Sequence, residues 1–541
     1  MTDPTRMIHA RGSWSEMRAG FRWPKPVRFN IAEMCCERWA RTQPQRVAMT
    51  YLRPDGETRD YTFAQLSRAS SRLANALAAR GLRRGDRCAL LLPQTPEALL
   101  THLACYKLGA IVVPLFTLFG ADGLQFRLHA AGCSHLVTDR EGVEKIETIR
   151  DQLPLLRVVY SIDERISGTY GFWQELGKAA DACPVADTTR DDPAFISFTS
   201  GTTGPPKGAL HGHRVLLGHL PAIELHHDFP PKPGDRMWTP ADWAWMGGLM
   251  NALLPSLWYG VPVVAHRMAK FDPDHAFHIL NVMGVRNAFL PPTALKLMHQ
   301  TSASASLRTV GSAGEALGTD LTEWGQWALG TTINEFYGQT ECNAVLSNAH
   351  TVYAPKPGST GRAVPGHDVA VLSTEGHPLP PGKPGEIGIR KGSMSMFLEY
   401  WGRPDKTEEK FKGDWMLTGD EAVQDDDGHI WFRSRQDDVI TSSGYRIGPS
   451  EIEDCINQHP DVAMSAVVGI PDPVRTEIVV AYVVPMAGRM RNALANDLIT
   501  RVRERISPHV APRDIRFLDD LPMTATGKIR RRDLRAQADT V

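Results

Sequence analysis

The sequence predicts an α/β fold with two domains. The expected N-terminal domain, residues 1–435, is large and has several subdomains: parallel-type sheets flanked by helices, plus a small β-barrel-like subdomain. The expected C-terminal domain, residues 436–541, is small, mobile and α+β. Three observations support this prediction. A chain of 541 residues is too long for one hydrophobic core. Short apolar segments alternate with helical segments, which is typical of parallel strands joined by crossover helices. A charged break, Arg435-Gln436-Asp437-Asp438, precedes the last stretch of about 100 residues, a length that suits a compact domain.

Capping residues and apolar runs divide the first part of the chain into elements. Thr62 and Thr95 are residues of the N-cap type, and Gly81 and Gly109 are residues that typically end helices. In chain order we expect a helix over 30–41, a helix from 62 to 81, a strand over 88–92, a helix from 95 to 109, a strand over 110–115, and a further helix and strand ending near 138. Residues 139–193 are richer in charge and predict a connecting region of loops.

The second part begins with an apolar strand over 194–198 and a glycine-rich loop. We then expect a helix over 211–227, strands over 309–313 and 333–337, and a small antiparallel sheet or barrel over 360–433. In the last domain we expect a helix over 449–458, strands over 463–468 and 478–484, and a helix over 492–506.

Composition excludes several classes of protein. The chain is 42% apolar and 22% charged with a formal net charge of -1, so no basic field favours nucleic acid or an anionic membrane. Residues 1–23 are polar and lack the apolar core of a signal peptide, and no apolar run approaches the ~20 residues of a membrane helix. The eight cysteines are scattered, without a Cys-x-x-Cys pair. We expect a reduced, cytoplasmic enzyme.

The glycine-rich loop after the apolar strand has the composition of a phosphate-binding loop. It supplies three glycines, four hydroxyl groups and one lysine: Thr199, Ser200, Gly201, Thr202, Thr203, Gly204 and Lys207, with Gly208 following. Glycines allow the backbone to approach a ligand, and hydroxyl and ammonium groups donate to phosphate oxygens. A flexible surface turn is the alternative. The loop differs from the P-loop of ordinary NTPases because Pro206 precedes Lys207.

Two further groups of residues have both a structural and a functional interpretation. Histidines occur at 211, 213, 219, 226 and 227. Because no acidic partner lies at ligand spacing, we expect them on the surface of a helix rather than at a metal. The segment containing Trp243, Trp245, Met246, Gly247 and Gly248 fits either the core or an apolar pocket.

Small polar turns follow several of the expected strands. Gly314, Glu315 and Ala316 follow one strand, and Gly338, Gln339, Thr340 and Glu341 follow the next, after Tyr337. Thr418-Gly419-Asp420 ends a third apolar run. Parallel strands that end in such turns predict a ligand crevice at their carboxyl ends.

The motifs occur in one order that resembles the adenylate-forming superfamily over nearly the whole chain. They are the glycine loop, Gly-Glu-Ala, Tyr-Gly-Gln-Thr-Glu, Thr-Gly-Asp, Arg-x-Asp-Asp, Ser-Gly-Tyr-Arg and a final Gly527-Lys528. The flanking segments, such as 29–32 and 444–451, are most similar to medium-chain acyl-CoA synthetases. The resemblance implies formation of an acyl-adenylate from ATP and a carboxylic acid, with release of pyrophosphate, followed by transfer to coenzyme A. A medium-chain or branched fatty acid is the expected substrate, with an aromatic acid as the alternative.

The resemblance also implies a role for each matching residue. Lys528 would be the catalytic lysine of the first step, Glu341 the Mg²⁺ ligand, and Thr340 would lie beside the α-phosphate. The ATP site would further contain Thr199, Ser200, Gly201, Thr202, Thr203, Gly204, Lys207, Gly314, Glu315, Ala316, Tyr337, Gly338, Gln339, Asp420, Arg435 and Arg446. Trp243, Gly247, Gly314 and Gly338 would form the acyl pocket, Ser443 and Gly444 the coenzyme A channel, and Asp437 the hinge.

Two departures from the family pattern bear on function. Ser434 stands where the family usually has glycine, next to the hinge; because the hinge itself matches Asp437, we still expect rotation. Gly338 stands where acetyl-CoA synthetases have tryptophan. A glycine there is expected to open the floor of the acyl pocket, so acetate is not expected to be the best substrate.

The expected partners are ATP, coenzyme A and a small carboxylic acid, with no nucleic acid and no membrane. A homodimer and a lysine acetyltransferase acting on Lys528 are further partner expectations. Two alternatives remain open at this point: an adenylating enzyme that loads a carrier protein, and a catalytically silent nucleotide-binding or scaffold protein. Intact Lys207, Glu341 and Lys528 argue against the silent protein.

Overall fold

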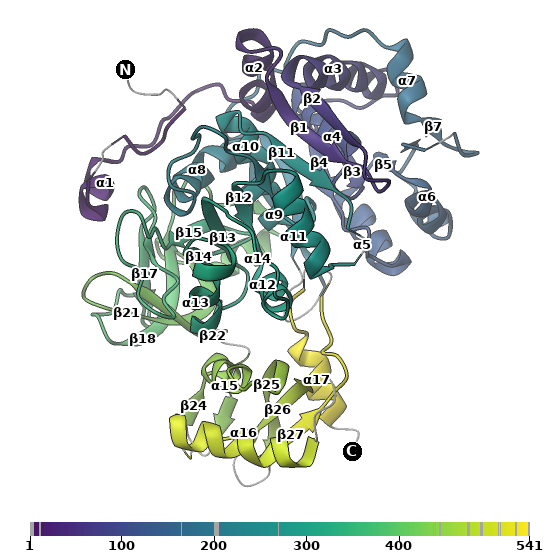
Figure 1. The fold of residues 1–541 in the computed structure, drawn as a ribbon. Coiled ribbons are helices and arrows are strands. Elements are labelled where there is room, and N and C mark those ends of the chain that lie inside the picture. Colours follow the sequence, from purple (N-terminus) through teal and green to yellow (C-terminus); the bar gives the residue numbers. More distant parts are fainter. Residues whose placement is uncertain are drawn as a thin grey trace.

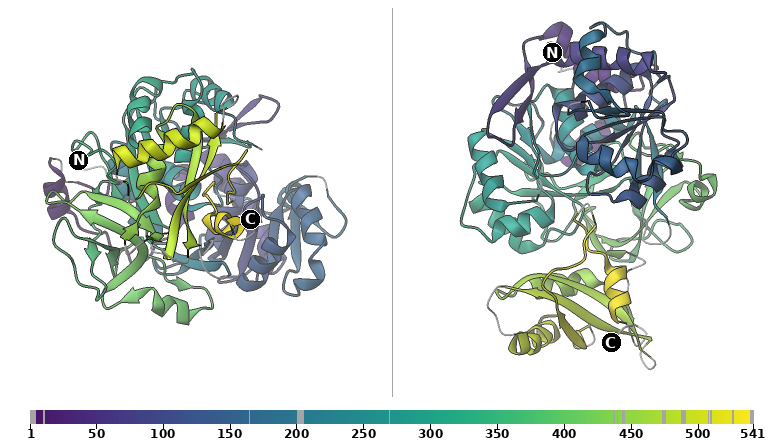
Figure 2. Two further views of the ribbon diagram at one scale, coloured as in Figure 1. Left: turned by 90° about the horizontal axis from the view of Figure 1, so that it is seen from below. Right: turned by 90° about the vertical axis from the view of Figure 1, so that its right-hand side faces the viewer.

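The computed structural model describes residues 5–9, 12–163, 165–199, 205–268, 270–435, 438, 440–442, 445–472, 476–486, 491–506, 508, 510–524 and 527–538. Two large sheets and one small antiparallel sheet form the upper body in Figure 1, and a fourth sheet lies below it. Figure 2 shows the same separation from a second side, with the last hundred residues beneath the rest. The α/β architecture predicted from the sequence is therefore confirmed.

The first large sheet has eight strands, and its central strands are parallel. In spatial order they are β19 (Glu399–Tyr400), β9 (Lys207–Gly212), β8 (Pro193–Thr199), β4 (Ile111–Pro114), β3 (Arg87–Leu91), β5 (His135–Thr138), β6 (Val158–Ser161) and β7 (Tyr170–Gly171). The helices of this region are α3 (Phe63–Ala79), α4 (Pro96–Leu108), α5 (Ala121–Ala131), α6 (Arg140–Glu147) and α7 (Phe172–Lys178). The region 139–193, expected to be a connecting region richer in loops, contributes two strands and two helices to the described part of the molecule.

The second large sheet has nine strands. The predicted ligand-binding turns after residues 313 and 337 belong to this sheet. Its spatial order is β16 (Arg362–Ala363), β15 (Asn343–Ser347), β14 (Ile333–Gln339), β13 (Thr309–Ser312), β12 (Asn287–Phe289), β10 (Met237–Trp238), β11 (Val263–His266), β1 (Val47–Leu52) and β2 (Thr58–Thr62). The helices here are α8 (Val215–His226), α9 (Met246–Gly248), α10 (Leu254–Tyr259), α11 (Pro273–Val282), α12 (Pro292–His299) and α13 (Thr319–Ala328). Strands β12, β13 and β14 are parallel neighbours, so the loops after β13 and β14 open at one edge.

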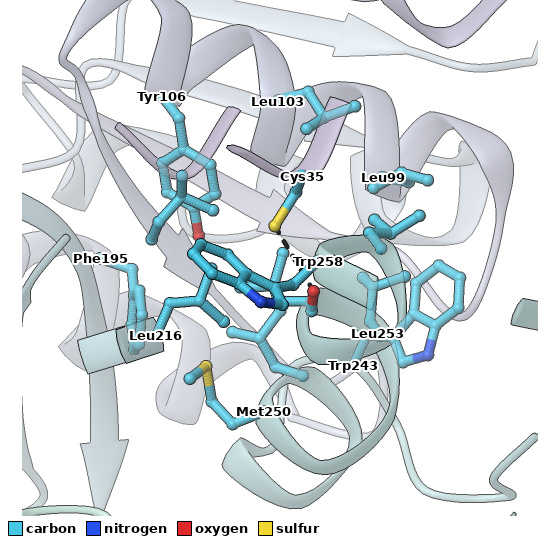
Figure 3. Close-up of a cluster of buried hydrophobic side chains, with 14 of the residues drawn as sticks. Cys35, Leu99, Leu103, Tyr106, Phe195, Leu216, Trp243, Met250, Leu253 and Trp258 are labelled. Carbon is cyan, nitrogen blue, oxygen red and sulfur yellow. Dashed lines mark hydrogen bonds between the residues drawn. The ribbon is translucent and has the colours of Figure 1, made fainter. Parts of the chain in front are cut away.

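A large apolar core lies between the two sheets. Figure 3 shows part of it, where Leu99 and Leu103 of α4, Leu216 of α8 and Leu253 pack near Trp243 and Trp258. Three short helical elements lie near the N-terminus: α1 (Trp14–Gly20), the π-helical turn Glu33–Glu37 and α2 (Arg38–Thr42). Cys35 and Cys36 of the π-helical turn are buried in the core.

The region 360–433 forms a small antiparallel sheet, as expected. Its strands are β17 (Val369–Leu372), β18 (Pro384–Arg390), β21 (Trp415–Gln424) and β20 (Phe411–Lys412), with β22 (Ile430–Arg435) paired to β21 and α14 (Pro404–Glu409) beside β20. Asp420 of β21 and Arg435 of β22 are direct cross-strand neighbours.

The last part of the chain has its own hydrophobic clusters, formed only by residues from 440 onward. Its strands are β24 (Tyr445–Ile447), β23 (Ile440–Ser442), β26 (Thr476–Pro485), β25 (Val462–Asp472) and β27 (Asp514–Phe517), with α15 (Pro449–Asn457), α16 (Arg491–Arg505) and α17 (Arg531–Ala538). It touches the body above through Gln458 Nε2, 3.5 Å from Thr319 Oγ1, and through Gly527, whose carbonyl accepts from Thr293 Oγ1 at 3.3 Å. The domain boundary at 435/436 remains a prediction.

The expectation of a helix over 211–227 was wrong at its start. Residues 207–212 form β9, which returns antiparallel along β8 with Thr199 opposite Lys207, and α8 begins only at Val215. Strands β8 and β9 are therefore antiparallel neighbours, and the glycine loop is the segment of sequence that connects them. Pairing with β8 is a tertiary interaction, and it decides the conformation of a segment whose local sequence is ambiguous.

The expectation that the histidines lie on a helix surface was also wrong. All five, at 211, 213, 219, 226 and 227, are buried. Burial lowers the pKa of His211, His213 and His227 to about 3, so these rings are neutral parts of the core. In the described residues the one cluster with metal-ligand geometry is Asp425, Asp427 and His429, and the Lys356 ammonium lies 2.5 Å from both carboxylates.

Candidate active site

The predicted phosphate loop is held at both ends by strands of the first sheet. Thr199 ends β8, and its hydroxyl donates to the Lys207 carbonyl at 3.4 Å across the hairpin. Ser200, Gly201, Thr202, Thr203 and Gly204 lie outside the described residues. The Lys207 Nζ is 4.8 Å from the centre of the Tyr400 ring. Burial lowers the pKa of Lys207, and the negative charge of Glu341 opposes this shift.

Glu341 follows β14 and is a buried carboxylate, 7% exposed. Its Oε1 accepts a hydrogen bond from the Tyr400 hydroxyl at 2.6 Å, and its backbone carbonyl accepts from Phe397 N at 2.8 Å. Its Oε2 accepts no hydrogen bond from the part of the chain that the structure describes. Mg²⁺ takes oxygen ligands, usually one or two carboxylates with several waters, so a Glu341 oxygen on the side of the site that holds Tyr400 and Lys207 fits this cation.

Asp420 is the second buried carboxylate of the crevice, 4% exposed. The Tyr337 hydroxyl and the Gln339 side-chain amide both donate to its Oδ2 at 2.5 Å. Arg435 Nε lies 3.8 Å from its Oδ1. Two donors fix the carboxylate, and burial together with Asp420 raises the pKa of Tyr337, which keeps that hydroxyl a donor. Tyr337 therefore forms a hydrogen bond with Asp420, in addition to any contact that its ring makes with the adenine.

The loop after β13 contains three residues of the predicted ATP site, Gly314, Glu315 and Ala316. Gly314 has φ +111°, a conformation that favours glycine, and Thr293 Oγ1 lies 3.4 Å from both carboxylate oxygens of Glu315. Lys296 pairs with Glu315 at 3.9 Å. Ala316 is half-buried in the same turn.

Lys528 reaches this crevice from the opposite domain. A tight turn holds it: Thr524 N donates to the Lys528 carbonyl at 2.7 Å, and Lys528 N donates to Thr524 Oγ1 at 3.1 Å. Burial between the domains lowers the pKa of its ammonium, and Arg435 lowers it further, whereas Glu315, Asp420 and Glu341 oppose the shift. Lys528 nevertheless keeps access to solvent, as a group that meets a substrate must. The structure therefore brings Lys528 into the field of the three acidic residues proposed from the sequence.

Trp243 and Gly338, two of the residues that the resemblance places in the acyl pocket, lie in the core and in a β-hairpin. Trp243 is 2% exposed and packs in the core beside Leu253 (Figure 3). A Cβ on Gly338 would lie 1.8 Å from the Asn343 carbonyl oxygen, within the β14–β15 hairpin. A side chain at 338 would therefore meet the Asn343 backbone, so the β14–β15 hairpin would have to shift to admit one.

Trp245 is the aromatic residue that faces Gly247 and Gly314. Cβ atoms built on these glycines would lie 2.6 Å and 3.3 Å from its ring. Phe289, at the end of β12, is 5.7 Å from Trp245 between ring centres. Two glycines and two aromatic rings thus pack together as an apolar cluster that includes Gly314 of the Glu315 turn.

The residues expected to control domain movement are mostly outside the described part. Asp437, Ser443 and Gly444 fall there, and for Arg446 the structure describes only the backbone, paired with Thr441. Asp438, next to the expected hinge, pairs with Arg531 at 3.6 Å and Arg535 at 3.1 Å. These pairs connect the start of the last domain to α17, the helix that follows Lys528.

Tyr400 and Phe289 were missed by sequence reasoning. Tyr400 lies in a two-residue strand, too short to have a pattern, and its partner Glu341 is 59 positions earlier. Phe289 could have been found, because it ends an apolar strand parallel to the strand before Gly314.

Among the described residues, none of the helices has the length and apolar character needed to cross a membrane.

Comparison with known proteins agrees with the site. The AMP-binding enzyme family matches residues 36–401, and the AMP-binding enzyme C-terminal domain matches 451–528. The chain is 33% identical over 532 residues to Rattus norvegicus "Acyl-coenzyme A synthetase ACSM4, mitochondrial", covering 95% of this chain and 91% of that protein.

Two solved structures are also similar. The anthranilate CoA ligase AuaEII in complex with anthranoyl-AMP is 27% identical, with a TM-score of 0.88 and coverage of 95% and 99%. The Brucella canis acyl-CoA synthetase is 33% identical, with a TM-score of 0.76 and coverage of 98% and 100%. These similarities favour coenzyme A over a carrier protein as acyl acceptor. The chain belongs to the AMP-binding enzyme family, among its AMP-forming acid–CoA ligases.

Proposed function

We propose that this enzyme activates a medium-chain or aromatic carboxylic acid with ATP and transfers the acyl group to coenzyme A. One observation carries the proposal. Thr293 Oγ1 lies 3.4 Å from both carboxylate oxygens of Glu315 and donates to the carbonyl of Gly527, the residue before Lys528, at 3.3 Å, so the smaller part of the chain meets the larger part with Lys528 at the Glu315 turn.

The crevice suits ATP in a defined orientation. The loop from Thr199 to Gly204 and Lys207 would bind the β- and γ-phosphates, with Thr340 beside the α-phosphate. Asp420 and Arg435 would hold the ribose, since a carboxylate fixed by two donors can accept from both hydroxyls. The adenine would lie along Gly314, Glu315, Ala316, Tyr337, Gly338 and Gln339, and Arg446 would approach from the small domain.

The reaction follows from the charges. A carboxylate oxygen attacks the α-phosphorus, the bond to the pyrophosphate oxygen breaks, and the products are acyl-adenylate and pyrophosphate. Lys528 would offset the repulsion between the acid and the α-phosphate. Mg²⁺ held through Glu341 would neutralise phosphate charge. The sulfur of coenzyme A, having lost its proton, then attacks the carbonyl carbon, and AMP leaves with the oxygen that joined it to the acyl group.

The acid would occupy the apolar surface bordered by Trp245, Gly247, Gly314 and Phe289. Aromatic rings facing two glycines suit a flat ring or an extended chain better than a two-carbon acid. The solved relative that holds anthranoyl-AMP supports an aromatic acid, and the rat relative is named only as an acyl-coenzyme A synthetase.

The two steps need different groups at one carbonyl, so the last domain, residues 436–541, would turn between them. Asp437 would be the pivot, and Ser443 with Gly444 would line the path of the thiol. The ion pairs of Asp438 with Arg531 and Arg535 support this proposal, because they make the chain next to the pivot and the helix after Lys528 move as one body.

Three further proposals concern partners and location. An acetyltransferase could silence the first step by removing the Lys528 charge. A homodimer and a cytoplasmic location also remain proposals; the names of the mammalian relatives carry the word mitochondrial.

Pyrophosphate release is the experiment that tests the proposed function. Acids from acetate to decanoate, with benzoate and isobutyrate, are supplied with ATP and then with coenzyme A. We expect acid-dependent pyrophosphate, then acyl-CoA, with hexanoate, octanoate or benzoate preferred over acetate. Acetate as the best substrate would contradict the acyl-pocket assignment, and no acid-dependent pyrophosphate would contradict the function.

A further inference from the structure

Tyr400 contacts the two charged groups on which the first step depends. It is 1% exposed, its hydroxyl donates to Glu341 Oε1 at 2.6 Å, and the Lys207 Nζ lies 4.8 Å from its ring centre. One side chain therefore joins the carboxylate after β14 to the ammonium at the start of β9.

The backbone around Tyr400 is fixed to the same two places. At one end of the segment 397–401, Phe397 N donates to the Glu341 carbonyl at 2.8 Å. At the other end, Tyr400 pairs with Ala209 of β9, and Trp401 N donates to the Gly208 carbonyl at 2.7 Å. The segment is thus a rigid connection between Glu341 and the strand that carries Lys207.

Opposite charges in one buried site tend to pair directly, because the surroundings screen them poorly. Lys207 and Glu341 are both described, yet no ion pair forms between them. Instead the ammonium lies over an aromatic face, and the carboxylate accepts from a neutral hydroxyl. A direct pair would place the ammonium where a cation ligand is needed and would withdraw it from the phosphates.

We propose that Tyr400 is a positioning residue that holds Glu341 oriented toward Mg²⁺ and keeps Lys207 available for the phosphates of ATP. The proposal rests on the proposed function. The hydroxyl occupies one carboxylate oxygen and leaves the other for the cation, while the ring supports the ammonium. The partners that orient a metal ligand matter almost as much as the ligand itself.

Tyr400→Phe tests the hydroxyl alone, because it keeps the ring. Mn²⁺ serves as a paramagnetic substitute for Mg²⁺, and its binding to the full-length enzyme with ATP is followed by EPR. ATP binding in EDTA is measured by calorimetry. We expect Mn²⁺ affinity to fall about 10-fold, at the lower end of the range for such partners. ATP affinity in EDTA should stay the same within a factor of about two.

Three comparisons separate positioning from a general structural loss. Tyr160→Phe removes another buried hydroxyl, which donates to the Ala76 carbonyl far from the crevice, and should change neither affinity. Tyr400→Leu also removes the ring, so ATP binding in EDTA should weaken as well. In a Glu341→Ala background, Tyr400→Phe should no longer affect Mn²⁺, because the two substitutions act on one interaction.

Unchanged Mn²⁺ affinity in Tyr400→Phe, or equal losses with Mn²⁺ and in EDTA, would overturn the role of Tyr400. An equal effect of Tyr400→Phe in the Glu341→Ala background would do the same. A wild-type chain that binds no ATP under either condition would instead contradict the proposed function, so the two failures are distinguishable.

Discussion

Glu224 makes the stability of the large domain depend on pH in a direction that can be measured. The carboxyl group of this buried residue of α8 accepts hydrogen bonds from Met7 N and Ile8 N, at 2.7 Å each, and from the Tyr259 hydroxyl at 2.8 Å. Burial raises its pKa from 4.5 to about 7, although the hydrogen bonds and Arg6 oppose the shift. The unfolded chain loses this proton near its ordinary pKa, whereas the folded chain keeps it to about pH 7.

The sign follows from proton binding. Between these two pKa values the folded state holds more protons than the unfolded state, so the contribution of Glu224 to stability decreases as pH rises. A shift of this size corresponds to about 3 kcal/mol. Glu224→Gln cannot ionise and should lose this dependence.

The assay is urea unfolding of wild type and Glu224→Gln at pH 5, 6, 7 and 8. The free energy of unfolding of wild type, relative to the variant, should fall by about 2.5 kcal/mol from pH 5 to pH 8, because part of the full effect is already lost below pH 5. Glu57→Gln, at an exposed turn, is the control and should show no pH-dependent difference. A wild-type minus Glu224→Gln difference that is constant over this range would refute the reasoning.

Three further predictions concern the reaction. Lys528→Ala should abolish pyrophosphate formation but largely spare thioester formation from supplied acyl-adenylate; equal loss in both half-reactions would contradict the role of Lys528. Glu315→Gln removes a negative charge that raises the pKa of Lys528, so the decline of the adenylation rate at alkaline pH should begin at a lower pH than in wild type. An unchanged pH profile would mean that the protonation of Lys528 does not cause this decline. Asp437→Pro fixes φ at the proposed pivot and should keep adenylation while most thioester formation is lost; comparable slowing of both steps would argue against domain rotation.

The ends of helices were predictable because local chemistry decides them. Thr95 caps α4 by accepting Ala98 N, and Gly109 ends it in the left-handed conformation, as the sequence indicates. Thr62 likewise caps α3 with a capping box. The order of motifs was sufficient to predict the family, because seven motifs recur in one order over nearly the whole chain.

Tertiary contacts decided what the sequence could not show. His211 belongs to a strand because β8 pairs with it, and His226 is buried because its ring stacks on Phe336 at 4.3 Å. A side chain at Gly338 would meet the Asn343 carbonyl on the neighbouring strand, a contact that the sequence alone does not reveal. Tyr400 has its role through Glu341, which no sequence period relates to it.

The transfer of oxygen is the most direct test of acyl-adenylate chemistry. Octanoate or benzoate labelled with ¹⁸O in both carboxylate oxygens is incubated with the enzyme, ATP, Mg²⁺ and coenzyme A, and the products are analysed by mass spectrometry. The account predicts one ¹⁸O in AMP and none in pyrophosphate, because the carboxylate attacks the α-phosphorus and AMP later leaves with that oxygen. Label in phosphate or pyrophosphate, or unlabelled AMP beside newly formed acyl-CoA, would contradict it.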